Sequence, residues 1–206
     1  MKNFLKSIFT FFFLLCLGFS GCTIDISSDS SDWGTDDYYV YYNYDGASQE
    51  AVEKVHELTN AFRTGNESFY RNNDSDNSVT NVNNLGNLVL DADLCRAARI
   101  RACEIVVLFD HTRPDGRDCF TVLGEQGISY NTAGENIAAR QPLRNESDIS
   151  VAEKIFYQWK EDNEPYSGQG HRRNMLNSNF THIGIAGVYA PGSQYGWYWC
   201  MILAKK

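Results

Sequence analysis

Two segments near the end of the chain constrain its fold more than any other feature. Residues 183–189 and 195–203 are rich in β-branched and aromatic side chains, and Pro191-Gly192 between them is typical of a turn that joins two strands. We expect this hairpin to lie at the centre of a sheet. A sheet must be covered on its faces, so the segments before the hairpin decide the fold class.

Helical patterns precede the hairpin. The first helix is expected to begin after the N-cap Ser48 and to end at Gly65, the second to start at Asp91 or Asp93, and the third to cover about residues 150–161. The second helix places the following side chains on one face: Leu94, Ala97, Ala98, Arg101, Ile105 and Leu108. Because helices and strands do not alternate regularly, we predict an α+β fold with helices packed on a mainly antiparallel sheet.

Residues 1–21 have the pattern of a secretory signal peptide. Lys2 and Lys6 precede an apolar run over residues 8–17, which is too short for a membrane span. The sequence Phe19-Ser20-Gly21-Cys22 is similar to a bacterial lipobox, in which the cysteine is lipidated and becomes the first residue. Cleavage by an ordinary signal peptidase, which leaves a secreted soluble protein, is the alternative.

A tether is expected to follow the signal peptide. Residues 22–46 are rich in Asp, Ser and Tyr and contain no Lys or Arg, which is typical of a flexible linker. The tyrosines within residues 38–44 either fold back as a strand or form a surface patch. Residues 47–206 then form one domain, and the Asn-rich residues 66–84 within it are expected to be a loop.

The charge of the chain argues against one class of partner. The full sequence has a formal net charge of -8, and removal of residues 1–21 takes away two lysines and no acidic residue, which leaves about -10. We therefore expect no nucleic-acid partner. Attraction to anionic lipids is not expected either, so membrane residence would come from a lipid anchor at Cys22.

Four cysteines remain in the predicted domain: Cys95, Cys103, Cys119 and Cys200. An exported protein can form disulfides. Cys95 and Cys103, however, fall on one predicted helix at positions about 12 Å apart along its axis, which is too far for a bridge between them. Buried free thiols are the preferred interpretation, with a disulfide framework as the alternative.

Three short polar segments, each bounded by apolar ones, carry one potential ligand apiece. His111 precedes a Pro-Asp-Gly turn, Glu135 is expected where a strand begins or ends, and His171 precedes a short helix. Either histidine alone is more often a structural residue than a ligand, so the interpretation depends on the set. We expect all three to line one cleft, where two imidazoles and a carboxylate can bind zinc or another divalent cation and leave a place for water.

The order and separation of these segments resemble the CAP superfamily, which comprises cysteine-rich secretory proteins, antigen 5 and pathogenesis-related 1 proteins and is also called the SCP domain. The resemblance is to bacterial members and covers about residues 48–203, including LCRAARIRACEI, HTRPDG, CFTVL, GENIA, GHRRNML and HIGI. It implies an α-β-α sandwich whose cleft is lined by two histidines and two acids. His111, Glu135 and His171 match three of these positions.

The fourth position of the cleft is open. In eukaryotic relatives an acid follows the tryptophan of the third helix by three residues, which here is Asp162, whereas bacterial relatives commonly have Ser there. Glu161 and Glu164 are close enough to compete. In the last strand, bacterial relatives often carry Gln where this chain has Cys200-Met201.

The sequence favours a binding module over an enzyme. Neither His-Glu-x-x-His nor Gly-x-Ser-x-Gly occurs, so no nucleophile is identified and Glu135 is the only candidate catalytic residue. We predict a lipid-anchored, extracytoplasmic interaction module whose cleft binds a divalent cation and a small ligand, a peptide or a protein. The alternative is a metal-dependent, peptidase-like hydrolase that acts on cell-envelope or extracellular peptides and uses the metal to activate water.

Overall fold

The computed structural model describes residues 44–72, 78–161 and 169–206. The predicted signal peptide, Cys22 and most of the tether lie outside the described residues, as do Asp162 and Glu164. Within these ranges, no helix combines the length and the apolar composition that a membrane crossing requires.

The described residues form five helices and seven strands. The helices are α1 (Gln49–Thr64), α2 (Ala92–Val107), α3 (Thr121–Glu125), α4 (Asp148–Lys160) and α5 (Gly170–Met175). The strands are β1 (Asp45–Gly46), β2 (Phe69–Arg71), β3 (Val79–Asn81), β4 (Val89–Leu90), β5 (Thr132–Arg140), β6 (His182–Tyr189) and β7 (Trp197–Lys205).

The predicted hairpin lies at the centre of the main sheet. The strand order is β1-β6-β7-β5, and β4 pairs with β6 as the only parallel neighbour among the described strands. Along the hairpin, pairing runs from Tyr189 opposite Trp197 to His182 opposite Ala204. Pairing of β5 with β7 then extends over all nine residues of β5, so β5 forms the edge of this sheet.

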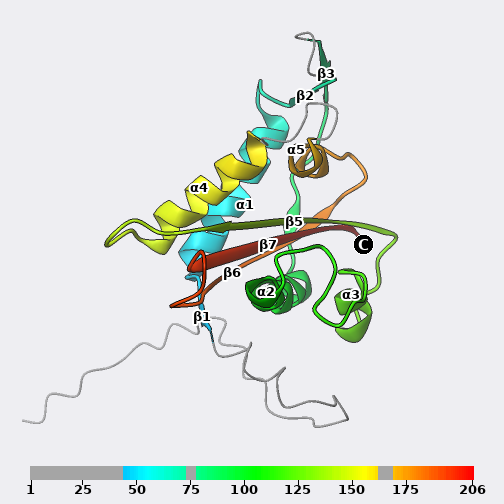
Figure 1. The fold of residues 1–206 in the computed structure, drawn as a ribbon. Helices are drawn as coiled ribbons and strands as arrows, with labels where there is room; N and C mark the ends of the chain where they lie inside the picture. Colours follow the sequence, from blue (N-terminus) through cyan, green and yellow to red (C-terminus); the bar gives the residue numbers. More distant parts are fainter. Residues whose placement is uncertain (1–43, 73–77, 162–168) are drawn as a thin grey trace, which may run out of the picture.

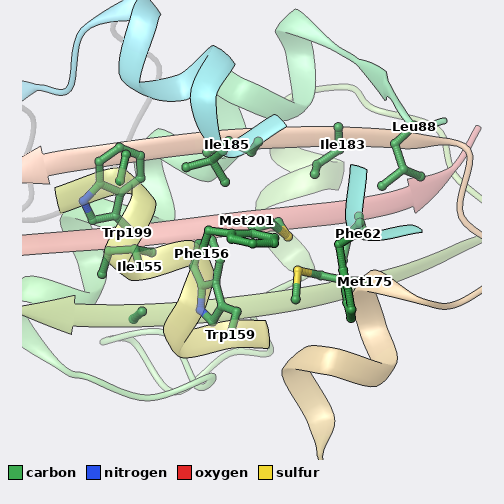
Figure 2. Close-up of a cluster of buried hydrophobic side chains, with 14 of the residues drawn as sticks. Phe62, Leu88, Ile155, Phe156, Trp159, Met175, Ile183, Ile185, Trp199 and Met201 are labelled. Carbon is green, nitrogen blue, oxygen red and sulfur yellow. The ribbon is translucent and has the colours of Figure 1, made fainter. Parts of the chain in front are cut away.

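Helices cover both faces of the sheet, with α1 and α4 on one side and α2 and α3 on the other (Figure 1). Side chains of β7 alternate between the two layers. Trp199 and Met201 pack in the cluster under α1 and α4 (Figure 2), whereas Tyr198 and Cys200 pack in the cluster under α2. This arrangement confirms the predicted α+β sandwich of three layers with a mainly antiparallel sheet.

Local capping explains where the first two long helices begin. The Ser48 side chain accepts a hydrogen bond from the Ala51 backbone N–H at 3.2 Å, and α1 ends before Gly65 as predicted. For α2, the cap is Asp91, which accepts from the Leu94 N–H at 2.9 Å. The structure thereby selects Asp91 over Asp93 as the start of this helix.

Close packing of α2 on β6 depends on a glycine. A Cβ atom on Gly184 would lie 2.1 Å from the carbonyl carbon of Leu94 and 2.3 Å from its carbonyl oxygen. Both are backbone atoms of α2, so they cannot move aside as the end of a side chain can. The helix can therefore approach the sheet this closely only where the strand has no side chain.

Three sequence-based boundaries differ from the structure. Asp45 and Gly46 pair with β6, so the folded part includes residues that we assigned to the tether. Residues 66–84, expected to be a loop, contain the small β2–β3 hairpin. The second helix ends at Val107, which leaves Leu108 42% exposed although we placed it on the buried face.

The four cysteines of the folded part are free thiols, in agreement with the preferred interpretation. Three of them, Cys103, Cys119 and Cys200, are buried and pack in the α2-side cluster or beside it.

Candidate functional site

Glu135 lies within β5, at the edge of the sheet. It stands opposite Ile202 of β7, whose side chain belongs to the cluster under α2, so Glu135 faces α2 as well. We predicted a strand that begins or ends at this residue, but β5 continues on both sides of Glu135. Its side chain is only 2% exposed, and a carboxylate buried this deeply needs hydrogen-bonding or charged partners.

Two side chains supply these partners. Arg101 of α2 donates from Nε to Oε2 at 2.7 Å and from Nη2 to Oε1 at 3.2 Å, and His111 places Nδ1 2.8 Å from Oε1. Burial, the largest single effect, would raise the pKa of Glu135, but the hydrogen bonds from His111 and Arg101 and the charge of Arg101 together hold that pKa below its usual value. Glu135 is therefore an anion at neutral pH.

This geometry changes the role expected of Glu135. We counted its carboxylate as a possible third metal ligand. Both oxygens instead accept hydrogen bonds within the protein, and almost none of the side chain reaches solvent. The Glu135 carboxylate is thus committed to contacts within the protein, and its hydrogen bond with Nδ1 fixes the orientation of the His111 ring.

His111 lies on the loop after α2, with its side chain 56% exposed. Because Glu135 is ionised, Nδ1 must carry the hydrogen in their contact, which leaves Nε2 of the neutral ring as an acceptor. The hydrogen bond to Glu135 and the charge of that carboxylate raise the pKa of His111 above its ordinary value, although desolvation opposes the shift. His111 thus offers an oriented, accessible nitrogen.

His171 lies in α5, which is attached to β5 through asparagine side chains. Asn136 donates to the backbone oxygen of His171 at 3.0 Å, and Asn174 donates to the backbone oxygen of Glu135 at 3.2 Å. Asn136 follows Glu135 in the strand and therefore points to the opposite face of the sheet. The segments of His111 and His171 thus approach the edge strand from its two faces. The His171 side chain is half-buried.

Of the three candidates for the fourth acid of the predicted cleft, the structure describes Glu161 alone. This residue caps the C-terminus of α4, is exposed, and forms a 3.6 Å ion pair with Lys160. Asp162 and Glu164 lie outside the described residues.

Within the described ranges, no three His, Cys, Asp or Glu side chains form a group suited to a metal ion. The two histidines of the predicted cleft, His111 and His171, lie on segments that each contact β5, through Glu135 and Asn136. Two surface hollows lie elsewhere: one between α1 and α4 beside Phe62 and Phe156, the other beside Arg63 and Asn84. The chemistry of the described residues is therefore concentrated at the edge of β5 rather than in either hollow.

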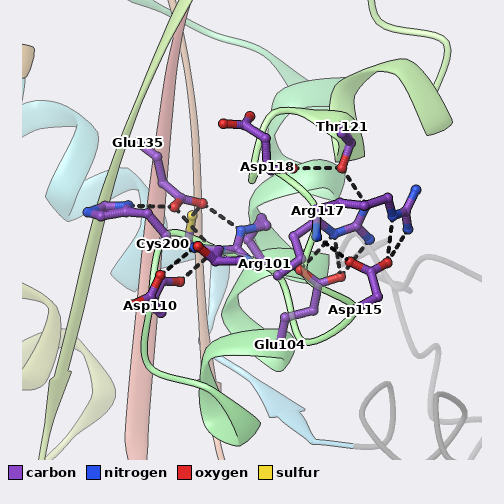
Figure 3. A network of polar contacts seen from close by, with 12 residues as sticks. Arg101, Glu104, Asp110, Asp115, Arg117, Asp118, Thr121, Glu135 and Cys200 are labelled. Carbon is purple, nitrogen blue, oxygen red and sulfur yellow. Dashed lines mark hydrogen bonds and ion pairs between the residues drawn. The ribbon is translucent and has the colours of Figure 1, made fainter.

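A buried network of arginines and acids supports this site (Figure 3). Arg101 also donates to Glu104 at 2.6 Å, and Glu104 accepts from Arg113 at 2.6 Å. Arg113 in turn donates a hydrogen bond from Nη1 to Oε1 of Glu125 at 2.8 Å. The side chains of Arg101, Glu104 and Arg113 are each no more than 2% exposed, so the network lies in the protein interior.

Sequence reasoning missed this network, although one signal was present. Arg101 falls on the apolar face of the predicted second helix, where a charged side chain must be paired if the helix packs on a sheet. Glu104 follows three residues later, at the spacing that brings two helical side chains together. The pairing with Glu135 joins residues 34 apart and depends on the tertiary fold.

The thiols near the site are poor nucleophiles. Cys200 lies 3.6 Å from Oε2 of Glu135 and is fully buried, which raises the pKa of its thiol well above the usual value. Burial also raises the pKa of Cys119 to about 12. Because the thiolate is the reactive form, neither residue is suited to covalent catalysis at neutral pH.

Comparison with known sequences gives one family and one relative. Residues 56–203 match the CAP family, described as the cysteine-rich secretory protein family. The protein YkwD of Bacillus subtilis (strain 168) is 36% identical over 103 residues, which cover 49% of this chain and 35% of YkwD. This chain therefore corresponds to about a third of that relative's length.

Solved structures share the fold at low sequence identity. An outer surface protein of Borrelia burgdorferi superposes with a TM-score of 0.55 at 13% identity, over 79% of this chain and 98% of that protein. NaASP2, solved with Zn2+, gives a TM-score of 0.54 at 16% identity, over 76% and 80% of the two chains. With the family match spanning most of the folded residues, the chain belongs to the CAP, or cysteine-rich secretory protein, family.

Proposed function

We propose that this protein is an extracytoplasmic CAP-domain binding module that is anchored to a membrane by a lipid on Cys22. In this proposal, His111 and His171 hold zinc or another divalent cation at the edge of β5, and the site recognises a small ligand or a peptide. The Borrelia burgdorferi relative is described as an outer surface protein, and NaASP2 was solved with Zn2+. These two proteins share the fold of this chain, and what is said of each of them is consistent with the proposal.

One observation carries the metal proposal. The exposed imidazole of His111 donates from Nδ1 to a buried, ionised carboxylate at 2.8 Å, so Nε2 is the nitrogen that remains for a ligand. This is the arrangement in which an outer carboxylate fixes the tautomer and orientation of a metal-binding histidine. A bound divalent ion would supply a positive centre that polarises a carbonyl or carboxylate oxygen of the ligand.

Zinc titration by calorimetry on the purified protein tests this proposal. We expect His111→Ala and His171→Ala each to weaken zinc binding at least about 100-fold. Loss of a residue that hydrogen-bonds to a metal ligand typically weakens binding about 10–100-fold, and loss of the ligand itself should weaken it more. His56→Gln is the control, since His56 lies on α1 and contacts the Leu88 carbonyl instead. Wild-type affinity in both alanine variants would rule out a shared site.

The pH dependence of zinc affinity follows from the His111 environment. Zinc binds the neutral imidazole, so protons compete with it, and the raised pKa of His111 means that protonation begins above the ordinary value of 6.5. We therefore expect affinity to fall as the pH drops, starting above pH 6.5 and approaching about tenfold per unit for each histidine that must lose a proton. Calorimetry between pH 8 and 5.5 measures this, and a flat profile would contradict histidine ligation.

A metal-dependent hydrolase is the second candidate, favoured by the same accessible Nε2, because a divalent cation held there could activate a bound water. Incubating the zinc-loaded protein with a peptide library and detecting cleavage by mass spectrometry separates the two candidates. Binding without cleavage supports the module. Cleavage that disappears in His111→Ala supports the hydrolase.

A further inference from the structure

We propose that Arg101, together with Glu104 and Arg113, positions the histidine site: these residues fix the His111 tautomer and the path of the His111 loop, so that Nε2 is the nitrogen presented to a ligand. The inference rests on the proposed function and deepens it, because it names the residues that prepare His111 for binding.

Arg101 contacts Glu135 and the backbone immediately before His111. Its Nε and Nη2 atoms donate hydrogen bonds to the Glu135 carboxylate at 2.7 and 3.2 Å. Nη2 also donates to the backbone oxygen of Asp110 at 2.9 Å. Asp110 immediately precedes His111 in the chain. One guanidinium group therefore fixes the acceptor and the backbone from which the imidazole extends, in a planar geometry that a lysine cannot reproduce.

The loop is held on the other side of His111 as well. Arg113 lies two residues further on and is buried, with Nη2 2.6 Å and Nε 3.0 Å from Oε1 of Glu104. Glu104 also accepts from Arg101 at 2.6 Å, so a single carboxylate joins Arg101 and Arg113. The Pro114-Asp115 turn that follows is closed by the Gly116 N–H, which donates to the Arg113 oxygen at 2.8 Å.

The composition of the network favours positioning over simple stabilisation. Two guanidinium groups, Arg101 and Arg113, balance two carboxylates, Glu104 and Glu135, all nearly removed from water. Burying such charges costs desolvation energy, and apolar side chains of similar size often stabilise a fold as well or better. This network includes Glu135, which contacts the exposed His111 ring. We infer that its main effect is to hold that ring in one orientation rather than to stabilise the fold.

The tautomer of His111 distinguishes positioning from stabilisation. If Arg101 and Glu135 only stabilised the fold, substituting them would not change which ring nitrogen of His111 carries the hydrogen. With an anionic Glu135 held by Arg101, the neutral ring must carry its hydrogen on Nδ1. In Glu135→Gln, the amide oxygen is expected to face Arg101 and the NH2 group to face His111. Nδ1 would then have to accept, and the hydrogen would move to Nε2, where it blocks a ligand.

The test is 15N NMR of the histidine rings in the purified protein, at a pH where the imidazoles are neutral and without metal. Wild type is expected to show His111 protonated on Nδ1, and Glu135→Gln is expected to show it on Nε2. Arg101→Lys should give a mixture of both tautomers, because one ammonium group cannot hold both carboxylate oxygens. Mixed tautomers or an Nε2-protonated ring in wild type would overturn the proposal, and this result does not depend on whether any variant folds.

Zinc affinity supplies the second measurement. Arg101→Lys is expected to bind zinc 10–100-fold more weakly than wild type, as is usual when an outer partner of a metal ligand is lost. Arg99→Lys is the matched control on the same helix, since Arg99 contacts the Tyr44 backbone oxygen instead. Unchanged affinity and an unchanged tautomer in Arg101→Lys would refute positioning by Arg101. If wild type shows the Nδ1 tautomer but binds no zinc, the metal proposal fails while the positioning proposal stands.

Discussion

Replacing Glu104 by Gln is expected to lower the free energy of unfolding by about 3–5 kcal/mol, the usual cost of removing one partner from a buried ion pair. Glu104 accepts from Nη1 of Arg101 at 2.6 Å and from Nη2 of Arg113 at 2.6 Å, and its side chain is 2% exposed. Glutamine keeps the size of the side chain but removes the charge that both guanidinium groups share. Since domains are stable by only about 5–15 kcal/mol, much of the stability would be lost.

Urea unfolding followed by circular dichroism measures this change. The matched control is Glu57→Gln, which removes an acid from an exposed ion pair with Lys54 at 3.1 Å and is expected to change stability by no more than about 0.5 kcal/mol. Equal effects of the two substitutions would mean that the Glu104 network contributes no more than a surface pair.

Gly184→Ala is expected to destabilise the fold by about 3 kcal/mol or more, at the upper end of the range for overpacked cores. The added Cβ would lie 2.1 Å from the carbonyl carbon of Leu94, and the atoms in its way belong to the α2 backbone. Because no side-chain rotation can relieve this contact, α2 must move away from β6. That movement separates apolar surfaces along the whole α2 layer.

The control for this substitution is Gly124→Ala in α3. A Cβ there meets nothing within 4 Å, and alanine restricts the unfolded chain, so stability should be unchanged or should rise by up to about 1 kcal/mol. Thermal unfolding of both variants gives the comparison. A Gly184→Ala protein as stable as wild type would show that α2 packs less tightly on the sheet than the structure indicates.

The sequence was most informative where structure depends on neighbouring residues. Ser48 and Asp91 cap their helices as the pattern indicates, and Gly116 adopts the positive φ of 84° that the Pro-Asp-Gly turn requires. The β6–β7 hairpin occupies the predicted central place. A cap, a turn and a hairpin each depend on a few adjacent side chains, so single-sequence reasoning can identify them.

The candidate site could be predicted only in part. His111, Glu135 and His171 stood out as polar residues between apolar segments, and the contact between His111 and Glu135 agrees with their grouping. The sequence did not indicate that Glu135 would be buried, because that depends on which face of β5 meets α2. Nor could it reveal that Asn136 and Asn174 attach α5 to β5.

The sequence by itself therefore determined the long helices, the central hairpin, the α+β class and the residues from which a site can be built, since periodicity, caps and short motifs are local properties, while the three-layer arrangement was implied by the resemblance to a family. Only the tertiary structure decided what Glu135 does. Its partner Arg101 is 34 residues distant, and their contact in the interior buries the Glu135 carboxylate and bonds it to Arg101 and His111. Burial and charge pairing arise from contacts between distant segments, so the environment of this carboxylate could not be read from the residues around it in the sequence.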